Sequence, residues 1–310
     1  MKSAQPAASA AAPTRPAISS TGLLHLLVVY IVWGSTYLAI RVGVRPGSGF
    51  TPFMLGTMRA LVAGSLLLGW GALTRQRLRL TRAEFWTLTV TGLLLWVGGN
   101  GLVMLGEQRA DSGITALVIA GVPIWVAVME AVRDRRLPSL LLVGSLLLGL
   151  GGIAVLSMPL LLSGVRADTI AVIELLSASV SWALGTFIQS RRKFNLSPAV
   201  SSGVQILAGG VGFLIVTLLV GEPLPHPVAS AWIAWGYLVV FGSLLAFTSF
   251  VQALRLLPTR LVTTYSYVNP VIAVFLGFII LSEKITPWTI AGAVLVLLGV
   301  AGVFRSHGRA

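Results

Sequence analysis

Residues 265–287 read YSYVNPVIAVFLGFIILSEKITP, an apolar stretch that contains a helix breaker and a side-chain amide. Pro270 removes a backbone donor and clashes with the carbonyl of Ser266 in a helix. Inside a bilayer, freed backbone groups are tolerated only where other protein groups or a water-filled cavity satisfy them. Hydroxyl side chains crowd the turns before Asn269 and Pro270. The stretch therefore predicts a membrane-spanning helix whose polar half lines a cavity; the alternative is a structural kink with internally satisfied hydroxyls.

The rest of the chain is equally apolar. Its 310 residues are 56% hydrophobic and only 10% charged, with a mean hydropathy of +0.92. Apolar runs of about 20 residues, the length that crosses a hydrocarbon core, recur along it. We count ten, at 22–41, 52–72, 86–106, 113–132, 138–157, 170–190, 199–220, 232–254, 261–282 and 287–304. Because the runs are long and show no strict alternation, they predict an all-α integral membrane protein with ten transmembrane helices.

The positive charge is distributed asymmetrically. The net charge is +13, which by itself would allow a nucleic-acid partner. With the N-terminus inside, however, the inner segments hold sixteen Lys and Arg residues and the outer segments hold five. This bias predicts that both termini are cytoplasmic and that the basic residues set orientation in the inner membrane. No nucleic-acid partner is expected.

The two chain ends and the missing cysteines limit the remaining possibilities. Residues 1–21 are rich in Ala, Pro and Ser and predict a disordered cytoplasmic segment, and residues 305–310 a cytoplasmic C-terminus. The chain has no Cys, which excludes disulfides and Cys-based metal sites. We expect no metal and no cofactor.

The opening stretch has a counterpart in the first half of the chain. Residues 115–138, TALVIAGVPIWVAVMEAVRDRRLP, place Pro123 at a position 147 residues before Pro270. Other matches follow in the same order at offsets of 146 to 149 residues: 51–64 with 197–210, 142–152 with 290–302, and Trp33 with Trp182. Since five spans per copy is an odd number, the second copy must enter the membrane from the opposite side. The sequence thus predicts two inverted five-helix repeats, 22–157 and 170–304, with a linker at 158–169.

This pattern resembles a known family. WGSTYLAIRVG (33–43) and VNPVIAVFLGFIILSEKITPWTIAGAVLVLLGVAG (268–302) carry the resemblance, which covers residues 23–304. They are similar to the EamA-type transporters of the drug/metabolite transporter superfamily, whose relatives include bacterial exporters of aromatic amino acids. The resemblance implies a secondary transporter that exports small metabolites, and it leaves the metabolite open.

Aromatic and amide side chains near the middle of several spans are the candidate binding residues. Trp33, Tyr37, Trp182 and Tyr265 could form a stacking wall for a flat or apolar substrate. Asn100 and Asn269 could hold its polar end. The alternatives are plain core packing for the aromatic residues and helix–helix contacts for the amides.

Arg59 is the one basic residue placed well inside a span. An intramembrane Arg is costly and is a functional hypothesis by default. It could meet a substrate carboxylate or an internal acid, with Glu107 and Glu174 as candidate partners; a structural ion pair or snorkelling are the alternatives. No carboxylate falls at mid-depth, so facilitated diffusion or exchange is favoured over proton coupling, although Glu174 keeps coupling open.

Two further features concern movement. We expect Pro123 and Pro270 to be kinks that flex during alternating access. Asp134 and Glu283 occupy matching positions on opposite faces, where they could be gate contacts or merely solvated helix ends. The glycine-rich, uncharged spans at 138–157 and 287–304 are expected at the periphery or at a dimer contact, so the protein is a monomer or a homodimer.

Several functions compete at this stage. A membrane enzyme would need a catalytic constellation, and the sequence has no HExxH, no Walker loop and no paired carboxylates at helical spacing. A secondary transporter of small molecules in the lipid bilayer fits best, with aromatic or other apolar amino acids as the leading substrates. Drug efflux, sugar- or nucleotide-type metabolite transport and, less favoured, a passive channel remain as alternatives.

Overall fold

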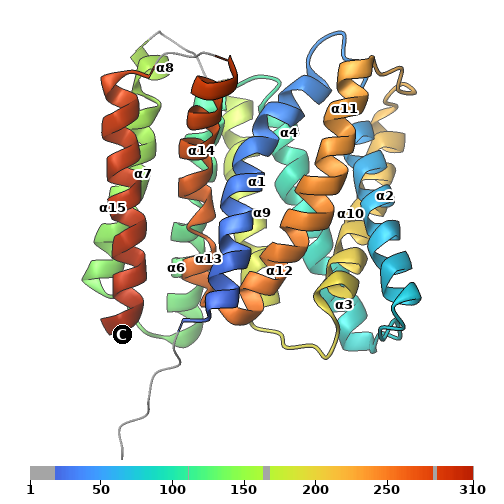
Figure 1. Ribbon diagram of the computed structural model, residues 1–310, viewed down its shortest axis with the longest axis horizontal. Coiled ribbons are helices and arrows are strands. Elements are labelled where there is room, and N and C mark those ends of the chain that lie inside the picture. Colours follow the sequence, from blue (N-terminus) through green and yellow to red (C-terminus); the bar gives the residue numbers. More distant parts are fainter. Residues whose placement is uncertain (1–17, 111, 163–167, 282–284, 310) are drawn as a thin grey trace, which may run out of the picture.

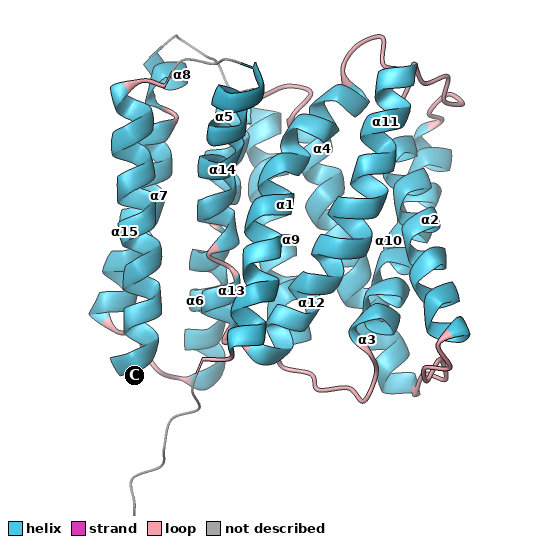
Figure 2. Cartoon of the chain, viewed as in Figure 1, coloured by secondary structure: helices cyan, strands magenta, loops and turns pink. Residues whose placement is uncertain are grey.

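The computed structural model describes residues 18–110, 112–162, 168–281 and 285–309, and this part of the chain forms helices and connecting loops (Figure 2). The helices run as a row of roughly parallel rods (Figure 1). In chain order they are α1 (Ser20–Val44), α2 (Pro52–Leu73), α3 (Arg82–Gly92), η1 (Leu93–Gly101), α4 (Leu102–Gly106), α5 (Ser112–Ile119), α6 (Val122–Asp134), α7 (Leu140–Leu156), α8 (Met158–Leu162), α9 (Thr169–Ser190), α10 (Pro198–Val220), α11 (Ala229–Tyr237), η2 (Leu238–Leu245), α12 (Ala246–Leu256), α13 (Thr259–Val262), α14 (Tyr265–Leu281) and α15 (Pro287–Arg309).

Local sequence explains where these helices begin. Side-chain oxygens at the N-cap position accept hydrogen bonds from backbone N–H groups of the first turn, which have no partner within the helix. Such caps stand before α1, α3, α7, α9 and α10, at Ser19, Thr81, Ser139, Asp168 and Ser197. Proline occupies the first helical turn of α2 and α10, where its missing N–H costs nothing.

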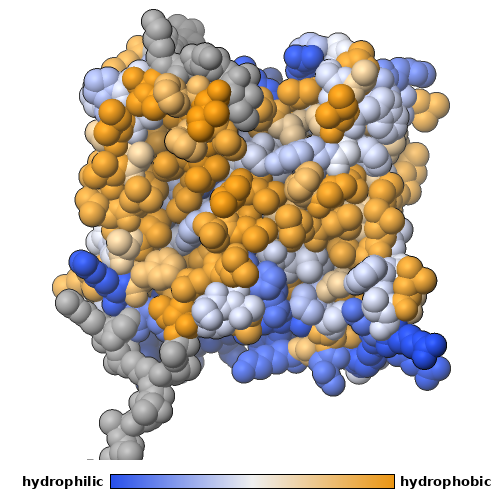
Figure 3. Space-filling view, viewed as in Figure 1, coloured by the Kyte–Doolittle hydropathy of each residue, from blue (hydrophilic) through white to orange (hydrophobic). Residues whose placement is uncertain are grey.

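The membrane-protein class predicted from composition is confirmed. Within the described residues, eight helical segments are long and apolar enough to cross a membrane, and apolar side chains form a broad band across the middle of the molecule (Figure 3). Hydrophilic side chains gather along the lower edge of the same view. The predicted spans at 138–157 and 261–282 correspond to the shorter helices α7 and α14, of 17 residues each. Ten crossings remain a prediction.

The predicted boundaries between segments fall partly outside the described residues. This is true of residues 1–17 in the predicted disordered N-terminal segment and of residues 163–167 in the predicted linker. The first residues of that linker form the short helix α8. At the other end, α15 continues to Arg309, so residues 305–309 extend the last helix and are not a separate tail.

Helix pairs that match in the internal repeat pack directly on each other. α2 packs against α10 so closely that a Cβ on Gly64 would lie 2.8 Å from the backbone nitrogen of Leu207. A Cβ on Gly210 would meet the backbone nitrogen of Leu61 at 2.9 Å. Gly64 corresponds to Gly210 in the repeat, and Leu61 corresponds to Leu207, each at an offset of 146 residues. The same contact between a glycine and a leucine is therefore made twice. A half-turn between two helices requires this reciprocity; superposition of the complete halves remains a prediction.

Two stretches of π-helix were not foreseen from the sequence. η1 interrupts the long helix from α3 to α4, and η2 interrupts the one from α11 to α12. They start 145 residues apart, at Leu93 and Leu238, and so occupy corresponding places in the two halves. π-Helical turns are rare and frequently lie at functional sites, because they shift the side chains that follow.

The two proline-containing spans are interrupted at different points. Between α5 and α6 the helix breaks at Ala120 and Gly121, one residue upstream of the Val122–Pro123 start of α6. In the other span the break lies at Thr263 and Thr264, between α13 and α14, and the helix runs unbroken through Pro270. A kink at Pro270 itself therefore stays a prediction.

The break at Thr263 and Thr264 is explained by the hydroxyl groups of these two residues. Thr264 Oγ1 donates to the carbonyl of Leu261 at 2.5 Å, and Thr263 Oγ1 donates to that of Arg260 at 3.3 Å. These side chains compete with the helix for backbone acceptors and end α13. Part of the polar cluster is thus satisfied internally, as the alternative interpretation of residues 265–287 held.

Candidate functional site

A cavity of about 90 Å³ lies between the two halves of the chain. Its walls come from α1, α2, η1, α4, α5, α9, η2, α12 and α14, so both π-helices contribute. All seven residues predicted to bind substrate line it: Trp33, Tyr37, Arg59, Asn100, Trp182, Tyr265 and Asn269. The structure therefore brings the predicted side chains together in one place. Pro123 and Pro270 do not line the cavity.

Trp33 on α1 is the centre of an aromatic cluster beside the cavity. Its ring centroid lies 5.0 Å from that of Tyr265, 5.2 Å from Phe250 and 5.5 Å from Trp182. The rings of Tyr265 and Trp182 meet it edge to face, the arrangement that aromatic pairs prefer. Trp33 Nε1 donates to the carbonyl of Gly242 in η2 at 3.1 Å, so its polar atom is already satisfied. This ring is oriented by core packing and also lines the cavity.

Arg59 on α2 is buried, with 7% of its surface exposed. Its Nε donates to Ser243 Oγ at 2.8 Å, and its Cζ lies 5.1 Å from the ring centroid of Trp96. Within the described chain, no carboxylate lies within 4 Å of the guanidinium. Glu174, one of its expected partners, instead pairs with Arg109 at 3.6 Å. The ion pair that the sequence suggested between Arg59 and Glu174 does not form, because Glu174 is paired with Arg109.

Two further side chains with hydrogen-bond donors line the cavity together with Arg59. Trp96, on η1, is almost fully buried, and its Nε1 has no hydrogen-bond partner among the described residues. Asn100, one turn further along, makes only a long contact of 3.4 Å from Nδ2 to the carbonyl of Leu95. A buried polar group without a partner is costly unless a ligand or water satisfies it. Together with Arg59 these groups form a wall suited to an anionic ligand.

Asn269 has a mainly structural environment. With its amide nitrogen directed toward them, it donates to the carbonyl oxygens of Tyr30 and Tyr265, at 3.2 and 3.0 Å. Tyr30 OH and Thr264 Oγ1 also share a hydrogen bond of 2.5 Å. These bonds join α1 to the break before α14. Asn269 thus joins α1 to α14 and also lines the cavity.

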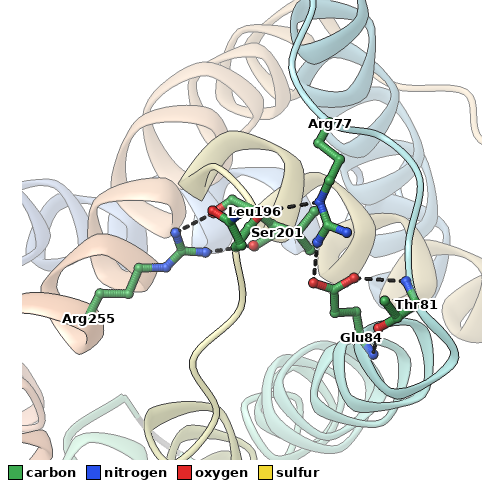
Figure 4. Close-up of polar contacts among 7 residues, drawn as sticks. Arg77, Thr81, Glu84, Leu196, Ser201 and Arg255 are labelled. Atoms are coloured by element: carbon green, nitrogen blue, oxygen red, sulfur yellow. Dashed lines mark hydrogen bonds and ion pairs between the residues drawn. The ribbon is translucent and has the colours of Figure 1, made fainter.

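Polar contacts close one end of the helix row. Arg255 on α12 donates to the carbonyl of Leu196 at 2.6 Å and to Ser201 Oγ at 2.7 Å, and Arg77 donates to the carbonyl of Asn195 (Figure 4). Two arginines therefore hold the loop between α9 and α10 from opposite sides. Nearby, Asp134 accepts two hydrogen bonds from Arg191, at 2.8 and 3.1 Å. The other predicted gate residue, Glu283, lies outside the described residues, as does its neighbour Lys284.

The sequence interpretation missed several residues at this site. Phe247, Gly242 and Thr36 line the cavity, and Phe250 packs on Trp33. Their signal was weak, because phenylalanine and glycine are common in every span. By contrast, Gln205 donates to Thr91 and Gln189 away from the cavity, as the helix–helix interpretation of the intramembrane amides expected.

The described residues form a helical membrane protein with a cavity between its halves. Within the described residues no group of three or more His, Cys, Asp and Glu side chains could hold a metal ion. The chain belongs to the EamA-like transporter family, whose model matches residues 20–158 and again residues 169–305. The family resemblance and the two-repeat organisation expected from the sequence are thereby confirmed.

Individual relatives agree with this assignment. An uncharacterized inner membrane transporter, YedA of Escherichia coli K12, is 37% identical over 254 residues, which cover 81% of this chain and 80% of the relative. An S-adenosylmethionine/S-adenosylhomocysteine transporter of Chlamydia trachomatis is 24% identical, covering 90% and 87%. A solved crystal structure matches with a TM-score of 0.77 over 94% of this chain and 98% of that one; at 20% identity it shows the fold alone. The chain is a multi-pass transporter of the inner membrane.

Proposed function

We propose that this transporter exports small carboxylate metabolites with a flat or apolar body, foremost aromatic or other apolar amino acids, from the cytoplasm. Both termini are cytoplasmic in this proposal, as the distribution of Lys and Arg indicates. Substrate binds in the cavity between the halves, and Trp33, Tyr37, Arg59, Asn100, Trp182, Tyr265 and Asn269 contact it.

The observation that carries this proposal is the buried, acid-free Arg59. A guanidinium inside a protein is normally paired with a carboxylate, since an isolated buried charge is strongly unfavourable. Among the described residues, the side chain of Arg59 makes one hydrogen bond, to the hydroxyl of Ser243, and one contact with an aromatic ring, that of Trp96. A substrate carboxylate would supply the missing partner and could accept two parallel hydrogen bonds from its free nitrogens.

The remaining wall of the cavity supports an apolar or flat substrate body. Trp33, Trp182 and Tyr265 present aromatic surface on one side, and Phe247 adds to it. Aromatic faces stack on flat groups and exclude water from the carboxylate contact, which strengthens it. Arg59 is the only charged side chain among the lining residues, so a diphosphate-bearing sugar nucleotide lacks sufficient counter-charge.

Alternating access is supported by features on both sides of the cavity. The helix breaks at Ala120–Gly121 and Thr263–Thr264 provide points at which α5–α6 and α13–α14 can bend. The contacts from Arg255 and Arg191 close the end at which the cytoplasm is predicted, and Arg109 with Glu174 joins helices at the other end. Transport would break each set in turn.

A second candidate substrate class comes from the S-adenosylmethionine/S-adenosylhomocysteine transporter of Chlamydia trachomatis. Such a molecule combines an amino-acid carboxylate with a flat adenine ring, and the same Arg59 and aromatic wall would suit it. Multidrug efflux is less favoured, because neutral or cationic drugs would leave Arg59 unpaired.

Ligand-induced thermal stabilisation of the purified protein tests the proposal, since a ligand that binds the folded state raises apparent stability. The panel contains L-phenylalanine, L-phenylalaninamide, L-alanine, S-adenosylmethionine and a cationic drug. We expect stabilisation by phenylalanine and none by its amide, which lacks the carboxylate. Saturable flux of the stabilising compound into proteoliposomes would then distinguish a carrier from a pore, through which flux is linear. Stabilisation by the amide and the acid alike would contradict the role of Arg59.

A further inference from the structure

Glu107 differs from every other described carboxylate at its end of the molecule. It caps α4 and lies one helical turn beyond Val103, which lines the cavity. Asp168 accepts a hydrogen bond from the backbone of Ile170, Glu174 pairs with Arg109, and Glu222 accepts bonds from Thr51, Phe53 and Met54. The carboxylate of Glu107 has no hydrogen bond and no ion pair within 4 Å among the described residues.

The surroundings of Glu107 connect it to the cavity. The helix α1 supplies Arg41, whose charge acts on Glu107, and Tyr37, on which Glu107 acts and which lines the cavity. From α9 the only acid is Glu174, already paired with Arg109, and from α2 the only ion is Arg59 in the cavity wall. Glu107 is therefore an acid without an ion pair among the described residues, partly accessible to solvent and one helical turn from a residue that lines the cavity.

We propose that Glu107 is the proton-binding group that couples export to the pH gradient, so that one proton enters the cell for each substrate molecule that leaves. The inference rests on the proposed export function and extends it. The carboxylate takes a proton from the outer solution, forming the neutral acid, and gives it up to the cytoplasmic solution after the cavity has reoriented. Only the carboxyl group of Glu107 gains and loses a proton in this cycle, and the substrate is not chemically changed.

The physical basis of coupling is the cost of burying an uncompensated charge. Closing the outer mouth removes Glu107 from water, which the neutral form tolerates and the ionised form does not. The ionised carboxylate of Glu107 can be neutralised by a proton or by the ammonium group of a bound amino acid, and one of the two is sufficient. The carrier therefore moves with a proton in one direction and with substrate in the other. Partial burial raises the pKa of Glu107 to about 7, against the opposing effect of Arg41, so that both forms are accessible near neutral pH.

The test uses full-length protein in proteoliposomes with radiolabelled L-phenylalanine. Counterflow against internal unlabelled phenylalanine, at equal pH on both sides, reports exchange alone. Uptake into vesicles with an acidic interior reports coupling, and a gradient of one pH unit sustains about tenfold accumulation at one-for-one exchange, because one pH unit and a tenfold concentration ratio are equal in free energy.

We expect wild-type protein to show both activities. Glu107→Gln should keep counterflow and lose accumulation, because a permanently neutral side chain allows movement without a proton. Glu107→Asp should retain accumulation, and the matched control Glu174→Gln, at the same end of the helices, should accumulate as the wild type does. Wild-type counterflow without pH-driven accumulation, or accumulation by Glu107→Gln at the wild-type level, would overturn the role of Glu107 alone. Absence of wild-type counterflow would overturn the proposed amino-acid export and the coupling with it.

Discussion

The cavity wall and the α7–α15 pair are both built from membrane-spanning helices, yet they have opposite compositions. The wall combines Arg59, two asparagines and a group of aromatic rings around open space. α7 and α15 stand side by side at one edge of the molecule and pack through glycines (Figure 1). A Cβ on Gly292 would lie 2.5 Å from the backbone nitrogen of Leu156, and one on Gly152 2.6 Å from that of Val296.

This difference shows that some membrane helices serve mainly to pack against each other, whereas others supply the side chains of the cavity. Lipid is as apolar as leucine, so close backbone approach through small residues is what joins two helices there. Polar and aromatic side chains are costly in lipid and are retained where they serve a pathway. Changes in the wall should therefore alter substrate recognition, whereas changes in the α7–α15 pair should alter assembly, and the following predictions test this division.

The largest effect on transport is expected for Arg59→Gln. A hydrogen bond to a charged group contributes about 1.5–3 kcal/mol, so losing the guanidinium should weaken apparent affinity for carboxylate substrates roughly 10- to 100-fold. The measurement is concentration-dependent flux in proteoliposomes, with Arg45→Gln, which replaces an exposed arginine near Ser230, as control. If Arg59→Gln lowers only protein abundance and the remaining protein transports normally, this residue is structural.

Trp182→Ala should have the next largest effect. An aromatic contact contributes about 0.5–1.5 kcal/mol beyond buried area, so affinity for phenylalanine should fall about threefold to tenfold, with a smaller change for alanine. Trp232→Ala removes an exposed tryptophan outside the cavity and should leave both affinities unchanged. Equal losses for both substrates would indicate general damage to the fold.

The outer pH should have a moderate effect. With a pKa of about 7, Glu107 is roughly nine-tenths protonated at pH 6 and roughly one-tenth protonated at pH 8. Because protonation permits the return of the empty carrier, export should speed up as the outer pH falls from 8 to 6. Efflux from preloaded vesicles at a series of outer pH values measures this, and the dependence should disappear in Glu107→Gln. An unchanged pH profile in that variant would assign the effect to another group.

A smaller loss is expected for Pro270→Ala. The helix already runs through this position, and the break lies upstream at Thr263 and Thr264. Restoring one backbone hydrogen bond should stiffen α14 and slow transport less than Trp182→Ala does, with protein abundance maintained. Comparison with Pro123→Ala, which lies directly at a break, distinguishes the two sites: the latter should slow transport more.

The smallest effect on recognition is expected in the α7–α15 pair. Gly292→Leu forces a side chain against the backbone of α7 and should lower the amount of folded protein. The surviving protein should bind substrate within about twofold of wild type, as expected for distant sites. Gly144→Leu is the matched control, because Gly144 is the repeat counterpart of Gly292 and a Cβ added there would have no neighbouring atom within 4 Å. A changed substrate affinity in Gly292→Leu would show that the pair contributes to the pathway.

Much of the fold and of the candidate site could be predicted from the sequence. Hydropathy identified the membrane class. Several sequence matches at a nearly constant offset, among them Pro123 with Pro270, identified the two-repeat organisation. Choosing aromatic, amide and basic residues near mid-depth was sufficient to identify seven side chains that meet at one cavity. This succeeded because a polar or charged group at mid-depth is too costly in lipid to be placed there at random.

Other features could not be inferred in this way. The π-helices η1 and η2 depend on how neighbouring helices pack, and no residue pattern specifies a π-turn. The break before α14 depends on Thr263 and Thr264, whose hydroxyls could equally have faced the cavity. The effect of a proline on a helix is local and can be predicted from sequence, whereas the hydrogen bonds of the Thr263 and Thr264 hydroxyls depend on the surrounding helices.

The sequence by itself determined that this is a helical, duplicated transporter of the inner membrane, because apolar run length, charge bias and repeat spacing are properties of the chain alone. Only the tertiary structure decided which ions are paired. Glu174 meets Arg109, while Arg59 and Glu107 are left without partners of opposite charge among the described residues. Ion pairing depends on which sides of the helices pack against each other. Helices of similar apolar composition do not specify this packing in their sequences. The unpaired Arg59 and Glu107 are the two groups on which substrate recognition and proton coupling are proposed to depend.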